Sequence, residues 1–348
     1  MISSCQIRNF KGIHECEIDD LKKINLFIGK NNSCKSTILE AMYYTLKEFY
    51  GKSELPQVFR RRNNVYCPGQ DLWFYHNTDE DIKIKIDLVN SVLTLELRFD
   101  EEHSSIRCST SFFDKKSSAK FTSSGIYSVD LDVVRSVTFS MPTTEDTQIK
   151  KFVNDALFLE SSVKYDVDSI EKLLGLLKTK NLASEFGEYL NRIFGLGQNW
   201  EFLPVPNRPK EFRAALIEKN KYLYISGLGD GIRYAIQVLG NAMLIRDSCI
   251  FIEEIETNQH PEALKKLIPI LLDISRKNNL QIIVTTQSPL TWTIFEHEFA
   301  DPSERDAFFQ CFHVQRNMED GTVNCKIASR KDYDVFWNGV MQDLYGTQ

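Results

Sequence analysis

Residues 27–42 read FIGKNNSCKSTILEAM, and this stretch decides how the rest of the chain is interpreted. Its order matches a phosphate-binding loop, in which GxxxxGK[ST] follows a buried strand and opens a helix. Gly29, Lys35 and Ser36 occupy the required positions, whereas Cys34 replaces the second glycine. In such a loop the backbone amides surround phosphates, Lys35 neutralises the β- and γ-phosphates, and Ser36 binds Mg²⁺. The alternative is a strand–turn–helix corner without a ligand.

The residues on both sides of this stretch support a nucleotide-binding loop. The apolar run KINLFIG before it is typical of a buried strand, and apolar residues repeat at helical spacing from Ser36 until Gly51 closes the helix. Further upstream, CQIRNF and CEIDDL alternate like two strands of a hairpin around Lys11 and Gly12. The residues that we expect to contact nucleotide are Gly29, Lys30, Asn31, Asn32, Ser33, Cys34, Lys35, Ser36 and Thr37.

The middle of the chain changes from strand to helix. Within residues 82–141, DIKIKIDLV, VLTLELRFD, SIRCSTSFF and VRSVTFSM alternate with period two, which predicts an antiparallel sheet. Beyond Pro142, helical spacing appears in EDTQIKKFVNDALFLE, SIEKLLGLLKT and LASEFGEYLNRIFG. The segment LPVPNRP interrupts that pattern, and KYLYISG resumes the chain as a strand.

The last third alternates helix and strand. A helix from Asp230, the strand SCIFIEE, a helix from Pro261 and the strand QIIVTTQ form a pattern that is typical of an α/β protein with a parallel sheet. We therefore predict one α/β head assembled from both ends of the chain, with an antiparallel β-layer and an inserted helical subdomain. Its expected parts are an N-terminal lobe at 1–142, a helical insertion at 143–214 and a C-terminal lobe at 215–348.

Two carboxylates follow the apolar strand Cys249–Ile252, at the strand end where α/β sheets place ligands. Glu253 is our candidate Mg²⁺ ligand, and Glu254 is our candidate base for polarising an attacking water molecule. The alternative interpretation is an acidic loop that caps the helix near Pro261.

Two further motifs end at strand or helix boundaries. The stretch SGLGDGIRYA contributes a glycine-rich turn before a helix, which is either a second anion-facing N-terminus or an ordinary turn. The strand IIVTTQ ends in polar residues where the chemistry of the sheet is expected. The residues concerned are Ser226, Gly227, Gly229, Asp230 and Gly231 in the turn, and Thr285, Thr286 and Gln287 at the strand end.

Composition restricts the class of protein. The net charge of −6 is not that of a protein coated for nucleic acid, although a local basic groove would still allow binding. No apolar run is long enough for a membrane span, and the first residues lack the apolar core of a signal peptide. The eight cysteines form no CxxC pair, so we expect neither a zinc site nor a disulfide framework. A reducing cytoplasm is the expected location.

The order of these motifs resembles the ABC-type ATPase heads of the OLD, RecF and SMC group. It is most similar to the small AAA-family ATPases that are paired with OLD nucleases and with bacterial anti-phage systems. IRNFKGI followed by INLFIGKNNSCKSTILEAM resembles the start of that group, GLGDGIR its degenerate signature motif, FIEEIETNQHP its IDEIENGLHP, and TTQSP its TTHSP. Too few residues follow Pro289 for the Toprim nuclease domain of OLD nucleases.

The resemblance implies a function and a division of labour. ATP and Mg²⁺ are the implied cofactors, with Ser36 and Glu253 supporting the metal, Glu254 activating water and Gln287 at the switch position. The residues from Ser226 to Gly231 would contact nucleotide held by a second copy, so that ATP joins a homodimer. Gln57 and Gln70 are both candidates for the glutamine that completes the metal site, with Gln70 preferred.

Cys34, Glu253 and Gln287 depart from the family pattern, in which glycine, aspartate and histidine are expected. These departures favour slow turnover, and we expect an ATP-dependent regulator of a separate nuclease or toxin, plausibly in phage defence. The alternatives are a RecF-like DNA-repair ATPase that binds duplex DNA and a scaffold that binds nucleotide without hydrolysis. Because Cys34 lies at a helix N-terminus beside Lys35, its thiol pKa is expected to be lowered.

Overall fold

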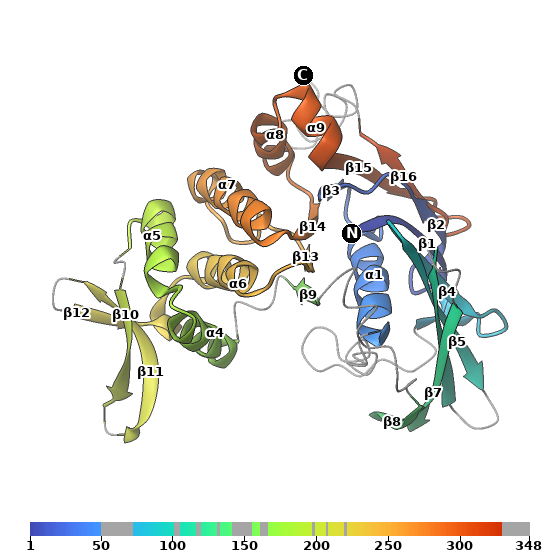
Figure 1. The fold of residues 1–348 in the computed structure, drawn as a ribbon, viewed down its shortest axis with the longest axis horizontal. Coiled ribbons are helices and arrows are strands. Elements are labelled where there is room, and N and C mark those ends of the chain that lie inside the picture. Colours follow the sequence, from blue (N-terminus) through green and yellow to red (C-terminus); the bar gives the residue numbers. More distant parts are fainter. Residues whose placement is uncertain are drawn as a thin grey trace.

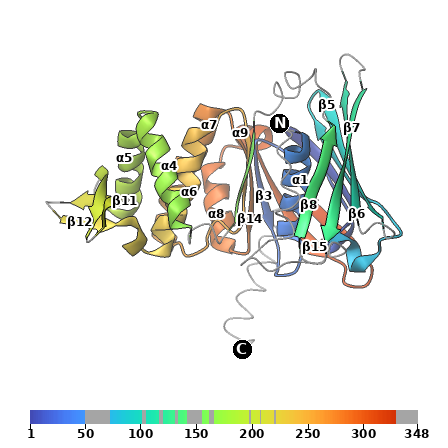
Figure 2. The ribbon, with the colours of Figure 1, turned by 90° about the horizontal axis from the view of Figure 1, so that it is seen from below.

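The computed structural model describes residues 1–49, 72–100, 105–115, 120–130, 133–140, 155–160, 166–196, 199–206, 208–218 and 221–328. Within them, thirteen strands form one mixed sheet, and three strands form a second, smaller sheet. Figures 1 and 2 show these sheets and their helices as successive layers. The α/β architecture with an antiparallel layer that the sequence predicts is confirmed.

The centre of the large sheet is parallel and joins both ends of the chain. β3 (Ile24–Ile28) lies between β14 (Gln281–Thr286) and β15 (Phe309–Arg316). Beyond β14 follow β13 (Cys249–Ile252) and β9 (Ala156–Leu159). All neighbouring pairs in this run are parallel, so the carboxyl ends of the strands meet at one edge of the sheet.

On the other side of β15 the sheet becomes mostly antiparallel. β16 (Val323–Ile327) is antiparallel to β15 and parallel to β2 (Ile13–Ile18), which forms the predicted hairpin with β1 (Ile2–Phe10). Every second residue of the next strands is buried, which is the period-two pattern that the sequence displays. The outer strands are β4 (Ile82–Leu88), β5 (Ser91–Asp100), β6 (Ser105–Asp114), β7 (Lys120–Asp130) and β8 (Val133–Ser140).

Helix α1 (Lys35–Phe49) fills the space between the parallel strands and the antiparallel layer, as Figure 2 shows. The predicted stripe from Ile38 to Leu46 is buried in a core that includes side chains of β1, β4 and β5. Phe27 and Phe251 reach the same core from the parallel strands. Because apolar neighbours lie on two sides of α1, the helix is fixed in position directly behind the loop that precedes it.

A second core covers the opposite face of the parallel strands. Ile250 and Ile252 of β13 point into this core, whereas Cys249 and Phe251 point toward α1. Three helices build the layer against the sheet: α6 (Asp230–Leu244), α7 (Pro261–Asn278) and α8 (Pro289–Glu298). Outside them lie α4 (Val167–Thr179), α5 (Ala183–Phe194) and the small sheet of β10 (Asn199–Val205), β11 (Arg208–Glu218) and β12 (Lys221–Tyr224), seen at the left of Figure 1. A short helix, α9 (Pro302–Phe308), precedes β15.

The helix expected from Pro261 shows how local signals define one element. Pro261 stands at the first helical position, and the His260 side chain accepts a hydrogen bond from the Glu262 N–H. Asn279 ends the helix in the left-handed conformation, with φ of 54°. In the described part of the chain, no helix combines the length and apolar character that crossing a bilayer requires.

Two predictions of local structure are wrong. Ala156–Leu159, at the end of a segment with helical spacing, is a strand that pairs with β13. Four consecutive apolar residues fit a buried strand as well as a helix, and pairing with β13 selects the strand. In KYLYISG only Lys221–Tyr224 is a strand, because Ile225–Gly227 forms a 3₁₀ turn. Gly51, Gln57 and Gln70 lie outside the described residues.

A buried ion pair fastens the β1–β2 hairpin to α1. Lys11 Nζ donates a hydrogen bond of 2.8 Å to Glu40 Oε2, and Glu40 is only 1% exposed. We expect Lys11→Met to lower the free energy of unfolding by about 3 kcal/mol, because a buried carboxylate loses its counter-charge. Urea unfolding measures this change.

The matched control is the double variant Lys11→Met/Glu40→Gln. It should recover most of the stability, because the buried carboxylate charge is then absent. A double variant as unstable as the sum of the two single variants would contradict a charge-based explanation.

Candidate nucleotide site

The loop from Gly29 to Cys34 connects β3 with α1 at the carboxyl edge of the parallel sheet. Its first residue has to be glycine, because a Cβ at Gly29 would lie 2.5 Å from the backbone oxygen of Val314 in β15. Asn32 and Cys34 both have left-handed backbones, with φ of 63° and 67°. The loop is therefore a tight, specific turn whose shape depends on the neighbouring strand.

Lys35 lies inside this turn. Its Nζ donates hydrogen bonds of 2.8 Å to the backbone oxygens of Gly29 and Lys30, and one of 3.4 Å to Ser33 Oγ. Burial lowers the pKa of Lys35 below its ordinary value, while Glu254 and Glu256 favour its charged form. The ammonium group is thus held where the loop curls, ready to bind an anion that enters the turn.

Cys34 takes a backbone conformation that favours glycine. A left-handed conformation costs a residue with a Cβ about 1–2 kcal/mol. The Cys34 thiol donates a weak hydrogen bond of 3.4 Å to the backbone oxygen of Gly12 in the β1–β2 turn. The side chain is thus directed toward that turn, whereas Lys35 Nζ binds the opposite end of the loop.

The expected lowering of the Cys34 pKa is wrong. Burial raises the pKa of the thiol above its ordinary value, although Arg316 and Lys35 act in the opposite direction. Removing a thiolate from water outweighs the attraction of two cations at this position. Cys34 is therefore not an activated nucleophile in this structure.

Ser36 and Glu253 meet although they come from opposite ends of the chain. The Ser36 hydroxyl donates a hydrogen bond to Glu253 Oε1, and Glu253 is buried at the end of β13. A hydroxyl and a carboxylate are hard oxygen ligands of the kind that Mg²⁺ prefers, so the two side chains fit this ion. Within the described residues, no group of three or more His, Cys, Asp or Glu side chains could hold a metal. An ion here would complete its shell with water molecules and with phosphate oxygens of a nucleotide.

Glu254 and Gln287 form the second pair. Gln287 Nε2 donates a hydrogen bond to Glu254 Oε1, and the Glu254 N–H donates one of 3.0 Å to Thr285 Oγ1. Glu254 has a left-handed φ of 48°, a conformation that non-glycine residues adopt mostly at turns and functional sites. The predicted base and the predicted switch residue are thus in direct contact.

Glu256 belongs to the same cluster but is not among the residues that the sequence singles out. Its Oε1 accepts a hydrogen bond of 2.8 Å from the backbone N–H of Gln287. Burial raises the pKa of Glu256, while hydrogen bonds from Gln287 and Thr286 oppose that increase. The only available signal was a third glutamate in the stretch EEIE, which alone does not distinguish a site residue from an acidic loop.

The predicted signature residues lie on the helical side of the sheet. Ser226 and Gly227 belong to the 3₁₀ turn after β12, and the turn leads into α6. A Cβ at Gly231 would lie 2.4 Å from the backbone oxygen of Asn258, in the loop after β13. A Cβ at Gly229 would meet no atom of the described part of the chain within 4 Å.

Hydrogen bonds tie this turn to the loop after β13. Gln259 Nε2 donates one of 2.7 Å to the Gly231 oxygen, and Arg233 pairs with Asp230. Among the described residues, no hydrogen bond or ion pair connects residues 226–231 with residues 29–37. The structure therefore brings the predicted nucleotide-binding and catalytic residues together with Ser36 and Glu253 of the predicted metal site, whereas Gln70 lies outside the described residues and the signature residues lie apart.

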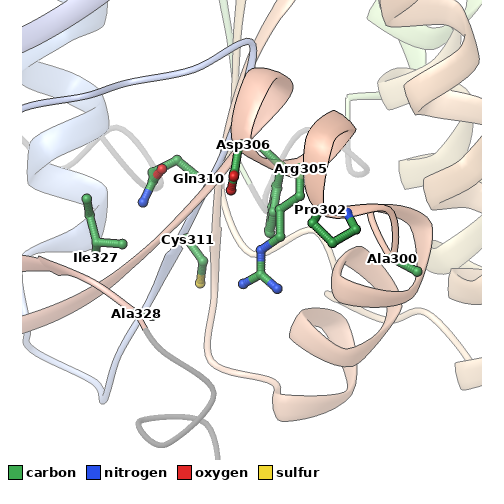
Figure 3. Close-up of a pocket in the computed structure, with 9 residues that line it drawn as sticks. Ala300, Pro302, Arg305, Asp306, Gln310, Cys311, Ile327 and Ala328 are labelled. Carbon is green, nitrogen blue, oxygen red and sulfur yellow. The ribbon is translucent and has the colours of Figure 1, made fainter.

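A separate cavity lies at the other end of β15. It has a volume of about 440 Å³, and its lining includes Ala300, Arg305, Cys311 and Ala328 (Figure 3). The Arg305 guanidinium is already bound to both carboxylate oxygens of Glu296, at 2.6 and 2.8 Å. Because the cavity adjoins the amino end of β15, it lies away from the edge where the phosphate-binding loop opens.

Comparisons with known proteins agree with this geometry. A sequence profile described as an AAA ATPase domain, AAA_15, matches residues 1–192 and 159–290. An "ATP/GTP phosphatase" of Helicobacter pylori is 24% identical over 342 residues, covering 86% of this chain and 90% of that protein. An uncharacterised protein of Methanocaldococcus jannaschii is 31% identical over 94 residues, covering 24% of this chain and 41% of that protein.

The solved SmcHead bound to the C-winged helix domain of ScpA has a TM-score of 0.53 with this structure, at 14% identity. The match covers 95% of this chain and 98% of that one. At this identity the comparison concerns the fold alone, which is that of an SMC head.

Exchanging Cys34 tests the strain in the loop. We expect Cys34→Gly to be more stable than Cys34→Ala by about 1 kcal/mol, because both lose the thiol but only alanine keeps a Cβ at positive φ. Urea unfolding of the two variants in parallel measures the difference. Equal stabilities would mean that the left-handed conformation of residue 34 carries no cost.

Proposed function

We propose that two copies of this chain bind ATP between them. The premise is that the chain belongs to the AAA ATPase domain family and is an ATPase. The observation that carries the proposal is the meeting of Lys35 and Ser36 with Glu253, Glu254 and Gln287 at one sheet edge. In this arrangement the loop from Gly29 to Thr37 holds the phosphates, and Glu254 activates the attacking water.

The chemistry follows from the positions of the side chains. When bound, Mg²⁺ supplies positive charge that stabilises the transferring phosphoryl group, and Ser36 and Glu253 would hold it. Glu254 accepts the proton of the attacking water, while the amide of Gln287 orients the Glu254 carboxylate. Gln287 replaces the histidine of related heads, so this position donates a hydrogen bond but carries no charge. We therefore propose slow hydrolysis.

The second copy explains the exposed glycine of the signature turn. The space beside Gly229 is open, while Gly231 is held against the loop after β13. Ser226, Gly227, Gly229 and Asp230 would complete the nucleotide site of the partner copy, in a head-to-tail homodimer. In this proposal, one chain carries cis residues for its own nucleotide and trans residues for the nucleotide of its partner copy.

A partner protein is the proposed target of this ATP-dependent dimer. The SmcHead of similar fold is bound to a domain of ScpA, which supports a head that works through another protein. The resemblance to ATPases of anti-phage systems suggests a cytoplasmic nuclease or toxin as that partner.

Hydrolysis is tested with two substitutions in the cis half. Lys35→Ala should abolish Mg-ATP binding because the loop loses its ammonium group, and Glu254→Gln should bind ATP but lower kcat by roughly 100-fold or more. Phosphate release and equilibrium titration measure the two effects. A Glu254→Gln variant with wild-type turnover would contradict the role of Glu254 as the base.

Dimerisation is tested at the signature turn. With Glu254→Gln to retain ATP, sedimentation should show an ATP-dependent dimer. Adding Gly229→Ala should weaken that dimer with only a small change in the urea midpoint, because a Cβ there meets no atom of the described residues within 4 Å. Gly231→Ala is the contrasting variant, and it should lower stability in the monomer because of the Asn258 oxygen. Unchanged dimerisation in Gly229→Ala would contradict the proposed trans contact.

The defence role is tested in cells that carry this gene with its genomic neighbours. Phage plating should be reduced by the wild-type genes and restored by Lys35→Ala, because the partner then loses its ATP-dependent control. Equal plaque numbers with and without the wild-type genes would rule out protection against the phages used.

A further inference from the structure

The β15–β16 hairpin lies against the phosphate-binding loop. His313 of β15 is paired with Ile28, the last residue of β3, and the Val314 oxygen limits the space at Gly29. Arg316 is the last residue of β15, two positions beyond Val314. It therefore lies past the carboxyl end of β3, at the edge of the sheet where the loop begins.

The alternation of β15 determines the side from which Arg316 approaches. Phe312 and Val314 belong to the core around α1, and Phe312 stacks on Phe27 with ring centroids 4.9 Å apart. Phe309 and Cys311 belong to the core on the opposite face. Since successive side chains of a strand point to opposite faces, Arg316 is on the same face as Val314, toward the N-terminus of α1.

The guanidinium of Arg316 has no carboxylate partner among the described residues. Its Nε is buried without a hydrogen-bond partner, and its Nη1 contacts only the thioether sulfur of Met318, at 3.9 Å. A thioether is a weak acceptor, so within the described residues this half-buried cation has one weak contact and one buried donor without a partner. By contrast, Arg305 and Arg98 of this chain each bind a carboxylate with two hydrogen bonds.

The charge of Arg316 also acts on Cys34, the last residue of the loop. The Arg316 charge lowers the pKa of the Cys34 thiol more than Lys35 does, against the larger effect of burial. Lys35 Nζ, in contrast, is bound to the backbone oxygens of Gly29 and Lys30 at the start of the loop. The two cations therefore act at different ends of the phosphate-binding loop.

The charges of the site make a second cation useful. Glu254, Glu256 and Glu253 all act on Lys35, so this part of the site has more negative than positive charge. A nucleotide triphosphate brings several further negative charges, of which Lys35 and Mg²⁺ offset only a part. A guanidinium also matches two phosphate oxygens at once.

We infer that Arg316 binds the α-phosphate of the nucleotide held by the loop of its own chain. The inference rests on the proposed nucleotide site and adds to it a residue from the β15–β16 hairpin. Lys35 then contacts the β- and γ-phosphates at the start of the loop, and Arg316 contacts the α-phosphate near its end. ATP and ADP share this contact, so it contributes to the affinity of both.

The experiment compares Mg-ATP and Mg-ADP affinities by calorimetry for the wild type and four variants. Arg316→Ala should weaken both nucleotides by a similar factor, roughly tenfold or more, because one charged pair is lost. Arg316→Lys should lose less, since it keeps the charge and the apolar stem but not the planar fork. Arg8→Ala, which removes a 2.9 Å surface pair with Glu15, is the matched control and should change neither affinity.

Three results would overturn the inference. Unchanged affinities in Arg316→Ala would show that Arg316 makes no contact, and a loss confined to ATP would place it at the γ-phosphate instead. If Lys35→Ala loses nucleotide affinity relative to the wild type and Arg316→Ala does not, only the role of Arg316 is refuted and the proposed function stays intact. Absence of nucleotide binding in the wild type would refute both. If urea unfolding shows that Arg316→Ala is not folded, Arg316→Lys decides the outcome, because its Mg-ATP and Mg-ADP affinities can be compared with the wild type in the same way.

Discussion

The insertion of β3 between β14 and β15 is the constraint on which the rest of the structure depends. Asn25 Nδ2 donates a hydrogen bond to the oxygen of Ile282, 257 residues away in the sequence. Each neighbouring parallel strand places one group of the candidate site at its carboxyl end: the loop after β3, the carboxylates after β13 and Gln287 after β14, with Arg316 on β15 as the residue that we propose to add. Because these pairings are non-local, the site has its geometry only after the two ends of the chain have joined.

Burial then determines the chemistry of the groups that this sheet brings together. It lowers the pKa of Lys35 and raises the pKa values of Glu256 and Cys34, in each case against the charged form. Glu254, Glu256 and Glu253 favour the charged form of Lys35, whereas Arg316 and Lys35 offset only part of the increase that burial causes in the Cys34 pKa. Burial therefore opposes the charged form of each of these three groups, and neighbouring charges or hydrogen bonds offset that effect to different extents.

Much of the fold could be predicted because its signals are local. Period-two alternation identified β4 and β5, and the start of α7 is marked by Pro261 at its first helical position. The loop with Lys35 and Ser36 and the carboxylates after Cys249–Ile252 were predicted separately, and the contact of Ser36 with Glu253 joins them. Residues whose role depends on distant partners could not be identified in this way. Glu256 is recognisable only through Gln287, Arg316 only through the loop, and β9 only through its pairing with β13.

The position of the small sheet has a mechanical consequence. β12 ends at Tyr224, and the signature turn begins at the next residue, without a linker between them. Leu223 would lie 3.2 Å from a Cβ at Gly227, and the Tyr224 hydroxyl is bonded to the Pro204 oxygen of β10. Because β12 and the turn are continuous, a displacement of β12 would move Ser226 and Gly227 with it. These two residues belong to the turn that we propose contacts the second copy's nucleotide, so the position of the small sheet would affect that contact.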